Sequence, residues 1–492
     1  MTRHILMLSW EYPPKVVGGL ARHVAYLSRA LAALGHRVTV LTHEAPGAPA
    51  REWDNGVEVH RLPVPGPAPL DFPGWVMRLN LEMVERALHL FACGQRFDLV
   101  HAHDWLAAYA GKALKHGLGL PLVATVHATE YGRNNGLHND LQRHIGNVEW
   151  WLTYEAWRVI CCSRYMEEEV RRVFQLPADK IRVVPNGVTL PPPGDPQADA
   201  AFRTRFAEPH EALVFFLGRL VHEKGVHVLL DAVPLILARH PATRFVIAGE
   251  GPARPDLEAQ TQRLGIAGRV TFFGYVNDQD RDRFLRTAQA AVFPSLYEPF
   301  GIVALEAMAA GTPVVASATG GFREIVRHGH NGLLALPGSP ESLAENVSAL
   351  LRAPGLAEKL RDTALQDVKE RYAWRRIAAR TAALYDEVLR ELEQCTWDAA
   401  LARRRAEDER RWEMWAGLLN RLPPGRYTDT RLADRRDGGA APSQGGSGEP
   451  SREGNAEPLR EGNAEPLRDE SVPPGHDGAP ALAGAYPQGP SA

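Results

Sequence analysis

The sequence predicts an α/β protein made of two doubly wound, Rossmann-like domains, and three observations lead to this prediction. Short apolar runs alternate with stretches of helical periodicity from Ile5 onward. A proline-rich break at 190–199 interrupts this alternation, and the alternation restarts at Leu213. Because alternating strands and helices are typical of parallel sheets with crossover helices, two such series predict two domains.

Length, composition and charge restrict the possible classes. The chain has 492 residues, 45% hydrophobic and 23% charged, as in globular proteins. At roughly 150 residues per domain, length alone suggests about three domains. With 56 basic and 59 acidic residues, the net charge of -3 gives no support for a nucleic-acid partner. No run approaches the ~18 apolar residues of a membrane-spanning helix, and the N-terminal apolar run is too short for a signal peptide. We therefore expect a soluble, cytoplasmic protein without stable membrane insertion.

The first domain is expected over residues 1–190. It begins with a strand at Ile5–Leu8, and apolar residues at helical spacing then run from Leu20 to Leu34, where Gly35 is suited to end a helix. Further strands are expected at Val38–Leu41, Leu99–His101 and Leu122–Val126. This order of strand, helix and strand is the one that a parallel sheet needs.

A stiff linker and a second domain follow. Leu190–Asp199 contains three consecutive prolines and a fourth two residues after the glycine, a composition typical of a rigid connection. The second domain is expected over residues 200–376, with a helix at Gly225–Ala238. Its strands are expected at Leu213–Leu217, Phe245–Ala248, Val270–Phe273, Ala291–Phe293 and Pro313–Ala316. Two such domains joined by one linker predict a ligand cleft between them.

The C-terminal part is expected to differ from the rest. Residues 377–425 predict helices, an amphipathic one at Ile377–Leu392 and a charged one at Arg403–Trp415. Residues 426–492 are expected to be a disordered tail without catalytic role. The last 56 residues hold 11 glycines and 9 prolines, and therefore too little apolar surface to offset the entropy of ordering. The octapeptide REGNAEPL occurs there twice in tandem, too short a repeat for a solenoid; a partner-docking tail stays open.

The four cysteines predict neither a disulfide framework nor a zinc site. Cys93, Cys161, Cys162 and Cys395 are sparse and include no CxxC pair. We interpret them as small, mostly buried apolar residues in a reducing compartment.

Two loops that join a predicted strand to a predicted helix are candidates for binding phosphate. In the first, Gly18 and Gly19 stand directly before a helix N-terminus, where backbone N–H groups can approach an anion, and Lys15 would add charge. In the second, GRLVHEKG, Arg219 and Lys224 follow a strand and suit a diphosphate. Taken alone, each loop has an alternative interpretation, a tight turn for the first and a solvated basic loop for the second.

The segment EPFGIVALE supplies two candidate carboxylates. We expect a short helix between Pro299 and Gly311, with Glu298 at its N-terminal mouth and Glu306 roughly two turns inside. Carboxylates are good acceptors for sugar hydroxyls, and Gly301 would expose a backbone N–H at the positive helix end. An ordinary polar helix face is the alternative interpretation.

Two acidic patterns suggest metal sites, and we interpret both as structural. His103 and Asp104 follow a first-domain strand, but no third ligand stands nearby at suitable spacing. The stretch from Asp278 to Asp282 contains the DxD signature of metal-dependent sugar-nucleotide enzymes. It stands at the start of a helical stretch, where aspartate is favoured as a cap and first-turn residue. We therefore expect no metal site.

Together these motifs resemble the retaining nucleotide-sugar glycosyltransferases of family 4, which have the GT-B fold. The carriers are the Gly18-Gly19 loop, PNGV at Pro185–Val188, GRLVHEKG, and EPFGIVALE, which matches the family's E-x7-E motif. The resemblance covers about residues 1–400. The segments HAHDWLAA and VHATEYGRNNGLHNDLQ look most like glycogen- and starch-synthase-type glucosyltransferases.

The resemblance implies transfer of glucose from a nucleoside-diphosphate glucose to an α-glucan, with no metal or other cofactor required. It implies the catalytic residues His127, Arg219, Lys224 and Glu298. It implies the donor-binding residues Gly18, Gly19, Phe300, Gly301 and Glu306, and places Asp104 on the acceptor or sugar side. Arg219 and Lys224 would bind the diphosphate, Glu298 the donor sugar and Glu306 the ribose. The helix near Ile377–Leu392 would cross back to the first domain.

One departure from the family leaves the acceptor open. Common bacterial synthases have Lys-x-Gly-Gly, whereas Lys15-Val-Val-Gly18-Gly19 has one residue more, so a substrate contact from Lys15 stays open. The nearest alternative is a family-4 transferase that acts on a lipid or a small sugar. In Trp75–Leu90 acidic residues are interleaved with basic ones, which argues against a membrane-binding face. A sugar-nucleotide epimerase and a non-catalytic binding protein are further alternatives, which EPFGIVALE and the intact charged residues oppose. The donor base and the oligomeric state stay open.

Overall fold

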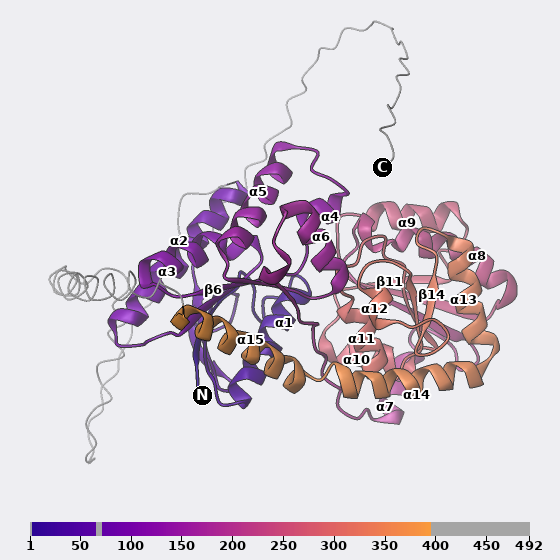
Figure 1. Cartoon of the computed structure of the whole chain (residues 1–492). Coiled ribbons are helices and arrows are strands. Elements are labelled where there is room, and N and C mark those ends of the chain that lie inside the picture. Colours follow the sequence, from indigo (N-terminus) through magenta and orange to yellow (C-terminus); the bar gives the residue numbers. More distant parts are fainter. Residues whose placement is uncertain (1, 65–70, 395–492) are drawn as a thin grey trace, which may run out of the picture. The chain divides into compact units, whose positions relative to one another are not determined.

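The computed structural model describes residues 2–64 and 71–394 and contains two sheets that are almost entirely parallel (Figure 1). The two-domain α/β fold that the sequence predicts is therefore confirmed. The helix expected at Arg403–Trp415 and the tail expected at 426–492 lie outside the described residues.

The first sheet runs in the order β3-β4-β2-β1-β5-β6-β7-β8. Its strands are β1 His4–Leu8, β2 Arg37–His43, β3 Arg51–Asp54, β4 Val57–Leu62, β5 Leu99–His103, β6 Leu122–Val126, β7 Arg158–Cys161 and β8 Ile181–Val183. All neighbours pair in parallel except β3 and β4, which pair antiparallel. The hairpin of β3 and β4 adds an antiparallel edge that the sequence analysis did not predict.

The second sheet runs in the order β11-β10-β9-β12-β13-β14. Its strands are β9 Ala212–Leu217, β10 Thr243–Ala248, β11 Val270–Gly274, β12 Ala290–Phe293, β13 Val314–Ser317 and β14 Leu333–Ala335. Numbered along this domain, the order is 3-2-1-4-5-6, the order of dinucleotide-binding Rossmann domains. All neighbours are parallel.

The helices that connect the strands vary widely in length. They are α1 Gly19–Ala33, α2 Phe72–Ala92, α3 Ala108–Leu118, α4 Glu130–Asn134, α5 Asp140–Glu155, α6 Arg164–Phe174, α7 Pro196–Arg203, α8 Val226–Arg239, α9 Arg254–Arg263, α10 Asp278–Thr287, α11 Ile302–Ala309, α12 Phe322–Ile325, α13 Pro340–Arg352, α14 Pro354–Arg371 and α15 Trp374–Gln394.

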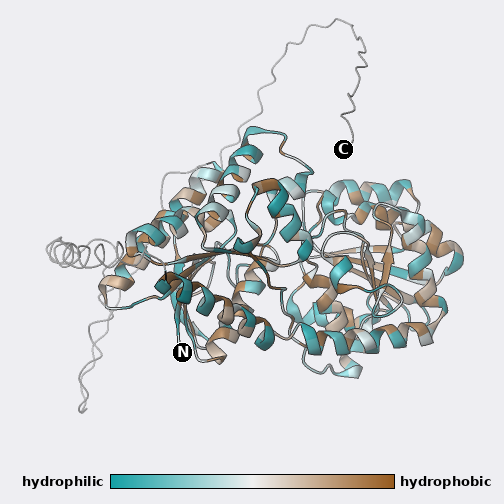
Figure 2. Ribbon diagram, viewed as in Figure 1, coloured by the Kyte–Doolittle hydropathy of each residue, from teal (hydrophilic) through white to brown (hydrophobic). Residues whose placement is uncertain are grey.

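Alternate residues of the central strands pack on opposite faces, as the two-residue period of a strand requires. Ile5 and Met7 of β1 belong to the buried cluster that holds α1 and α15, whereas Leu6 and Leu8 belong to the cluster that holds α2 and α3. Figure 2 shows the strands in hydrophobic colours and many outer helical residues in hydrophilic ones. Buried strands that read as apolar runs, such as β1 and β9, were located from the sequence, whereas β4, which is fully buried but reads VEVHRL, was not.

Helix α15 returns to the first domain after the second sheet is complete. It packs against α1, and the hydroxyl of Tyr385 lies 2.7 Å from Nδ1 of His101. Arg3 of the N-terminal segment donates to Asp386 at 3.0 Å. The linker differs from the expectation, because α7 begins at Pro196 inside it. Asp195 caps this helix, and proline suits a first helical turn because its missing N–H is not needed there.

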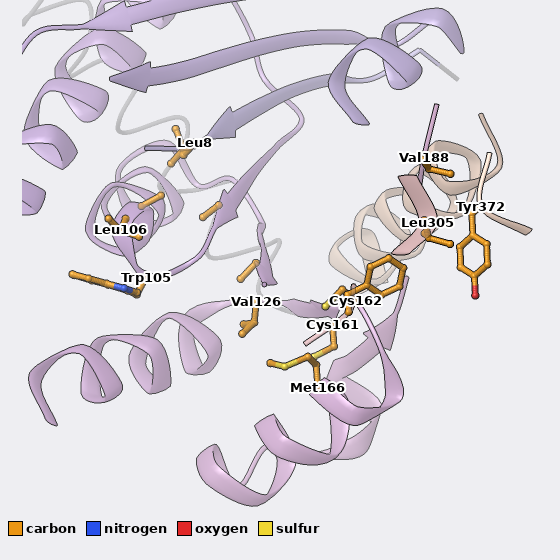
Figure 3. Close-up of a cluster of buried hydrophobic side chains, with 14 of the residues drawn as sticks. Leu8, Trp105, Leu106, Val126, Cys161, Cys162, Met166, Val188, Leu305 and Tyr372 are labelled. Carbon is orange, nitrogen blue, oxygen red and sulfur yellow. The ribbon is translucent and has the colours of Figure 1, made fainter. Parts of the chain in front are cut away.

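The described cysteines are mostly buried, as expected. Cys161 and Cys162 are buried in the cluster of Figure 3, together with Met166 of the first domain and Leu305 of the second. Cys93, which follows the last turn of α2, is exposed, which the expectation of mostly buried cysteines allows. Cys395 lies outside the described residues.

Over the part of the chain that the structure describes, we find no helix with the length and apolar character to cross a membrane.

Candidate active site

The predicted site residues gather where each sheet reverses its winding direction. In the first sheet this point lies between β1, followed by Gly18 and Gly19, and β5, followed by Asp104. In the second sheet it lies between β9, followed by the loop of Arg219 and Lys224, and β12, followed by Glu298. Open α/β sheets bind ligands outside the carboxyl ends of strands at such points.

Lys224 and Glu298 are in direct contact. The Lys224 ammonium donates to Oε2 of Glu298 at 2.7 Å, and the Ser295 hydroxyl lies 3.2 Å from the same oxygen. Glu298 is buried, so its negative charge needs this cation. Two candidates that the sequence places 74 residues apart therefore form one charged unit.

Backbone contacts hold the two loops of this unit together. The Leu296 N–H donates to the carbonyl of Glu223 at 2.8 Å. Gly225 has φ +66, and a Cβ there would stand 2.0 Å from the carbonyl oxygen of Pro294. Glycine is needed at this position for both the left-handed conformation and the close approach. Arg219, in the same loop, is 45% exposed at its side chain and pairs with Glu223 at 3.2 Å.

The E-x7-E segment differs in detail from the expected helix. Helix α11 begins at Ile302, and Gly301 precedes it with φ +105, where a Cβ would meet the Phe322 ring at 2.4 Å. The expectation that Glu298 stands at the helix mouth was therefore wrong, because the left-handed Gly301 delays the helix. Glu306 is its fifth residue, about one turn inside rather than two. Phe300 is buried, so its ring packs in the core and its backbone is the part left to line a donor pocket.

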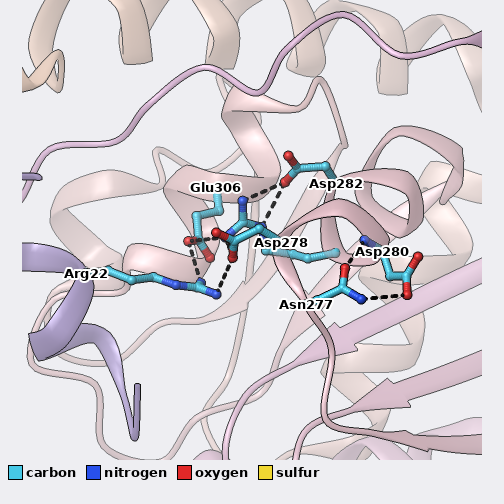
Figure 4. A network of polar contacts seen from close by, with 7 residues as sticks. Arg22, Asn277, Asp278, Asp280, Asp282 and Glu306 are labelled. Carbon is cyan, nitrogen blue, oxygen red and sulfur yellow. Dashed lines mark hydrogen bonds and ion pairs between the residues drawn. The ribbon is translucent and has the colours of Figure 1, made fainter. Parts of the chain in front are cut away.

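Glu306 is the centre of an ionic network between the two domains (Figure 4). Its Oε1 accepts from Arg22 of α1 at 2.9 Å and from Arg281 of α10 at 3.3 Å. Its Oε2 is buried and has no hydrogen-bond partner among residues 2–64 and 71–394. Asp278 accepts from Arg22 at 2.8 Å and from Arg281 at 2.9 Å. The nearby acids raise the pKa of Arg281 against the effect of burial.

The DxD stretch starts a helix, as expected, but its aspartates do not cap it. Asn277 is the N-cap of α10, and its side chain accepts from the Asp280 N–H at 2.8 Å. Asp278 and Asp280 lie in the first turn. Asparagine is as good a cap as aspartate, so the sequence alone did not distinguish them.

A cavity of about 470 Å³ opens beside Glu306. Its lining includes Arg22, Tyr26 and Trp374 and the linker residues from Gly187 to Asp195. This volume lies within the range of small-molecule sites. Arg219, Lys224 and Glu298 are not among its lining residues, so the cavity reaches only the Glu306 end of the candidate site.

The glycine loop of the first domain lies against the E-x7-E helix. Gly18 is the N-cap of α1 in an extended conformation, and a Cβ on Gly19 would meet Cδ1 of Ile302 at 3.0 Å. The Glu11 carboxylate accepts from the N–H of Val17 at 2.6 Å and of Ala21 at 3.3 Å. Burial raises the pKa of Glu11 to about 7. Glu11 was not predicted from the sequence, and it binds N–H groups that flank the Gly18-Gly19 pair.

Asp104 and His127 are joined through the backbone. Oδ1 of Asp104 accepts from the His127 N–H at 2.7 Å, and Asp104 itself has φ +58. Burial raises the pKa of Asp104 to about 6, an effect that Arg133 opposes. Burial also lowers the pKa of His127 to about 3, so its imidazole is neutral at physiological pH.

Three imidazoles from distant parts of the chain meet beside this pair. His23 of α1 joins His103 and His127, and one ring nitrogen from each lies within 4.8 Å of the others. Burial lowers the pKa of all three, and neutral imidazole is the form that binds metals. The expectation that no third ligand stands near His103 was therefore wrong, because the fold brings His23 from 80 residues away. Nδ1 of His103 also lies 3.2 Å from Nε2 of His127, a hydrogen-bonding distance, so two of the three imidazoles are already in contact with each other.

The relatives of this chain are glycosyltransferases. Residues 17–190 match the family model Glycosyltransferase Family 4, and residues 199–367 match Glycosyl transferases group 1. An uncharacterized glycosyltransferase from Methanocaldococcus jannaschii is 40% identical over 389 residues, 77% of this chain and 97% of that protein. The chain belongs to glycosyltransferase family 4.

Other comparisons agree on this family and differ in the acceptor that the relatives' names give. A glycogen synthase from Mycobacterium tuberculosis is 37% identical over 77% of this chain and 94% of that protein. A D-inositol 3-phosphate glycosyltransferase from Streptomyces griseus is 31% identical over 76% of this chain and 85% of that protein. The solved sucrose-phosphate synthase from Thermosynechococcus elongatus has a TM-score of 0.69 and 27% identity, and covers 79% of this chain and 100% of its own. The GT-B fold and the glycosyltransferase family expected from the motifs are confirmed.

Proposed function

We propose that this family-4 enzyme is a retaining glucosyltransferase that moves glucose from a nucleoside-diphosphate glucose to an α-glucan. The contact between Lys224 and Glu298 carries the proposal. A cation suited to a diphosphate and a carboxylate suited to sugar hydroxyls stand 2.7 Å apart where two central strands end. The 37% identity to a glycogen synthase over 94% of that protein supports the glucan acceptor.

Lys224 and Arg219 are proposed to stabilise the departing diphosphate. Negative charge grows on it as the bond to the sugar breaks, and fixed cations are more effective at such a site than water is. Arg219 is half exposed and held by one ion pair at the loop surface, so its guanidinium can turn toward a phosphate at small cost. The backbone of half-buried Gly18 and exposed Gly19 is proposed to pack against the same phosphates.

Glu298 and Glu306 are proposed to hold the donor. Glu298 would exchange part of its contact with Lys224 for a hydroxyl of the sugar, and the backbone of Phe300 and Gly301 would line the sugar pocket. Oε2 of Glu306 is the free acceptor beside the cavity, and a ribose hydroxyl is a suitable donor for it. Arg22 and Arg281 would keep this carboxylate ionised and oriented.

The chemistry proposed is attack from the side of the leaving group. The bond from the sugar's anomeric carbon to the phosphate oxygen breaks through an oxocarbenium-like state, and the acceptor oxygen bonds to the same face. A phosphate oxygen takes the acceptor's proton. Of the described carboxylates, the two proposed to lie beside the reacting sugar are both engaged, Glu298 with Lys224 and Asp104 with the His127 N–H, so neither is offered as a nucleophile. Neutral His127 would hydrogen-bond the donor sugar, with Asp104 holding its loop on the acceptor side.

The positive charges proposed to stabilise the diphosphate come from Arg219 and Lys224 of the chain itself. We therefore propose that the enzyme needs no metal or other cofactor. Its proposed partners are the nucleotide-sugar donor and the glucan, without a nucleic acid. A different acceptor, a small sugar or a lipid, is the second candidate, and the 31% identity to a D-inositol 3-phosphate glycosyltransferase favours it.

A donor and acceptor panel tests the proposal. Purified protein is given radiolabelled ADP-, UDP- and GDP-sugars with glycogen, maltoheptaose, inositol 3-phosphate or lipid extract. We expect label from a nucleoside-diphosphate glucose in the glucan, and an α linkage in the product by NMR. Lys224→Ala serves as the inactive control. Transfer only to inositol 3-phosphate or to lipid would replace the glucan assignment with the second candidate.

A further inference from the structure

A group of aromatic rings lies at the carboxyl end of the first sheet, outside the catalytic residues already described. Trp10 follows β1, and Phe72 and Trp75 lie in the first turn of α2. The rings of Phe72 and Trp75 are parallel within 7° at 6.0 Å, and Trp10 meets Trp75 edge to face at 6.3 Å. We call these three residues the aromatic shelf.

The shelf presents apolar surface to solvent. Phe72 is 45% exposed, and Trp10 and Trp75 are half-buried. The N-cap holds this turn in place, since the Asp71 side chain accepts from the Gly74 N–H at 2.9 Å. A flat aromatic face carries partial negative charge and attracts polarised C–H groups, which a sugar ring presents on its apolar face.

Lys15 gives the shelf a polar end. Its ammonium lies 5.4 Å from the ring centres of both Trp10 and Trp75, and it donates to Nδ1 of His43 at 2.6 Å. Burial and the neighbouring Lys15 lower the pKa of His43 to about 4, so the ring is neutral and accepts this bond. An ammonium has three N–H donors, so two remain for a hydroxyl or for water. This places Lys15, whose spacing to the glycines departs from the family motif, beside the shelf.

The shelf is continuous with the acceptor side of the candidate active site. The edge of Phe72 meets the buried ring of Trp105 at 5.7 Å and 84°. Trp105 directly follows Asp104, at the end of β5. A sugar chain whose terminal hydroxyl reaches Asp104 and His127 would therefore run next along Phe72, Trp75 and Lys15.

We propose that the aromatic shelf and Lys15 bind glucosyl units of an α-glucan acceptor beyond the unit that reacts. This inference rests on the proposed glucan acceptor and deepens it, because a site beyond the reacting unit selects chains over single sugars. Each ring would stack on one face of a glucosyl unit, while Lys15 donates to a hydroxyl. A glucan is favoured over a lipid surface because the rings lead to Asp104 and end on a hydrogen-bonding group.

Phe72→Ala and Trp75→Ala test the shelf. We expect KM for maltoheptaose to rise about tenfold in each, the factor that 1.4 kcal/mol gives. KM for the donor and kcat are expected to stay within about twofold, since the shelf lies outside the residues proposed to bind the donor. Trp150→Ala is the matched control, because Trp150 stacks on Tyr154 at 5.5 Å, is 46% exposed and lies on α5.

A binding measurement separates the shelf from the catalytic assignment. Maltoheptaose is titrated calorimetrically into wild type and variants without donor, and anionic vesicles are titrated in parallel. Weaker maltoheptaose binding in Phe72→Ala and Trp75→Ala alone supports the shelf. Wild-type transfer to glucan with unchanged KM and binding in both variants overturns the shelf and leaves the proposed function standing. Absence of glucan binding, or vesicle binding that the two variants lose, overturns the shelf as a glucan site. Absence of glucan transfer in wild type overturns the proposed function.

Discussion

Arg22 in the first helix donates from Nη1 to Oε1 of Glu306 in the E-x7-E helix, across 2.9 Å and 284 residues of sequence. The same guanidinium reaches Asp278 at 2.8 Å, so one cation of the first domain holds two acids of the second (Figure 4). Both partners of the Arg22–Glu306 pair are largely shielded from water, which makes the pair stronger than one on the surface.

Replacing Arg22 with alanine is expected to weaken donor binding. Oε1 of Glu306 would keep its hydrogen bond from Arg281 but lose the one from Arg22. With one charged hydrogen bond lost and one kept, we expect donor KM to rise about fivefold, or roughly 1 kcal/mol, with kcat nearly unchanged. Steady-state kinetics with varied donor at saturating acceptor measures both.

An exposed ion pair provides the control for this change. Arg239 pairs with Glu345 at 2.8 Å between α8 and α13, and Arg239→Ala should leave donor KM as it is. A lower donor KM in Arg22→Ala would contradict the role given to it, because it would show that Arg22 competes with the nucleotide for Glu306.

Replacing Lys224 with alanine is expected to reduce turnover by about 10²–10³-fold, the usual effect of removing one transition-state charge partner. Arg219→Ala and Glu298→Ala are expected to lose orders of magnitude in kcat as well. Circular dichroism should show all three folded, because Arg219 is half exposed, Lys224 ends a single 3₁₀ turn (His222–Lys224), and Glu298 keeps the Ser295 hydroxyl as a polar neighbour. Lys359→Ala, an exposed lysine of α14, is the control. Near-normal turnover in Lys224→Ala would remove Lys224 from the mechanism.

The central strands and the loops that follow β1 and β9 were predictable because their signals are local. An apolar run such as Leu213–Leu217 predicts a buried parallel strand. A glycine followed by two cations at the end of such a strand predicts a ligand-binding loop. The start of α11 was mispredicted although its end was right. Proline at 299 suits a first helical turn, but the left-handed Gly301 packed against Phe322 prevents the helix from starting there.

The pairings between distant segments left no signal in the sequence. Arg22 and His23 occupy ordinary positions in an amphipathic helix, and nothing nearby indicates that one meets Glu306 and the other His103. Glu11 was missed for a related reason. A carboxylate before a glycine loop looks like any loop residue until the fold turns it back to accept from the Val17 and Ala21 N–H groups.

Treatment with EDTA is expected to leave activity intact. The Asp278 carboxylate is paired with Arg22 and Arg281, which leaves it a poor metal ligand. Turnover before and after chelation, with and without added manganese or zinc, measures this. Loss of activity that a metal restores would contradict the expectation. Asp278→Asn and His23→Asn would then show which group holds the ion, because only the variant that removes a ligand should weaken the rescue.

Acid is expected to destabilise the protein through its buried imidazoles. Burial lowers the pKa of His23, His101 and His103, and that of His127 to about 3, whereas an unfolded histidine titrates near 6.5. Below pH 6.5 the unfolded chain therefore binds protons that the folded chain does not, and the free energy of unfolding falls as pH falls. Glu11 acts in the opposite sense, since its raised pKa of about 7 makes the folded chain take up a proton first.

His23→Asn isolates the histidine contribution from these opposing acids. His23 is buried among the rings of His103, His127 and Trp374, and burial lowers its pKa against a smaller opposing effect of Asn186. Between pH 6 and pH 5 we expect the slope of unfolding free energy against pH to be lower in the variant by about 1 kcal/mol per pH unit, one proton's contribution. Urea unfolding at several pH values gives this slope, with the exposed His330→Asn as control. Equal slopes in wild type and His23→Asn would show that His23 is already protonated in the folded protein. The imidazoles of His23, His103 and His127 would then carry a positive charge, which would contradict their proposed neutral state.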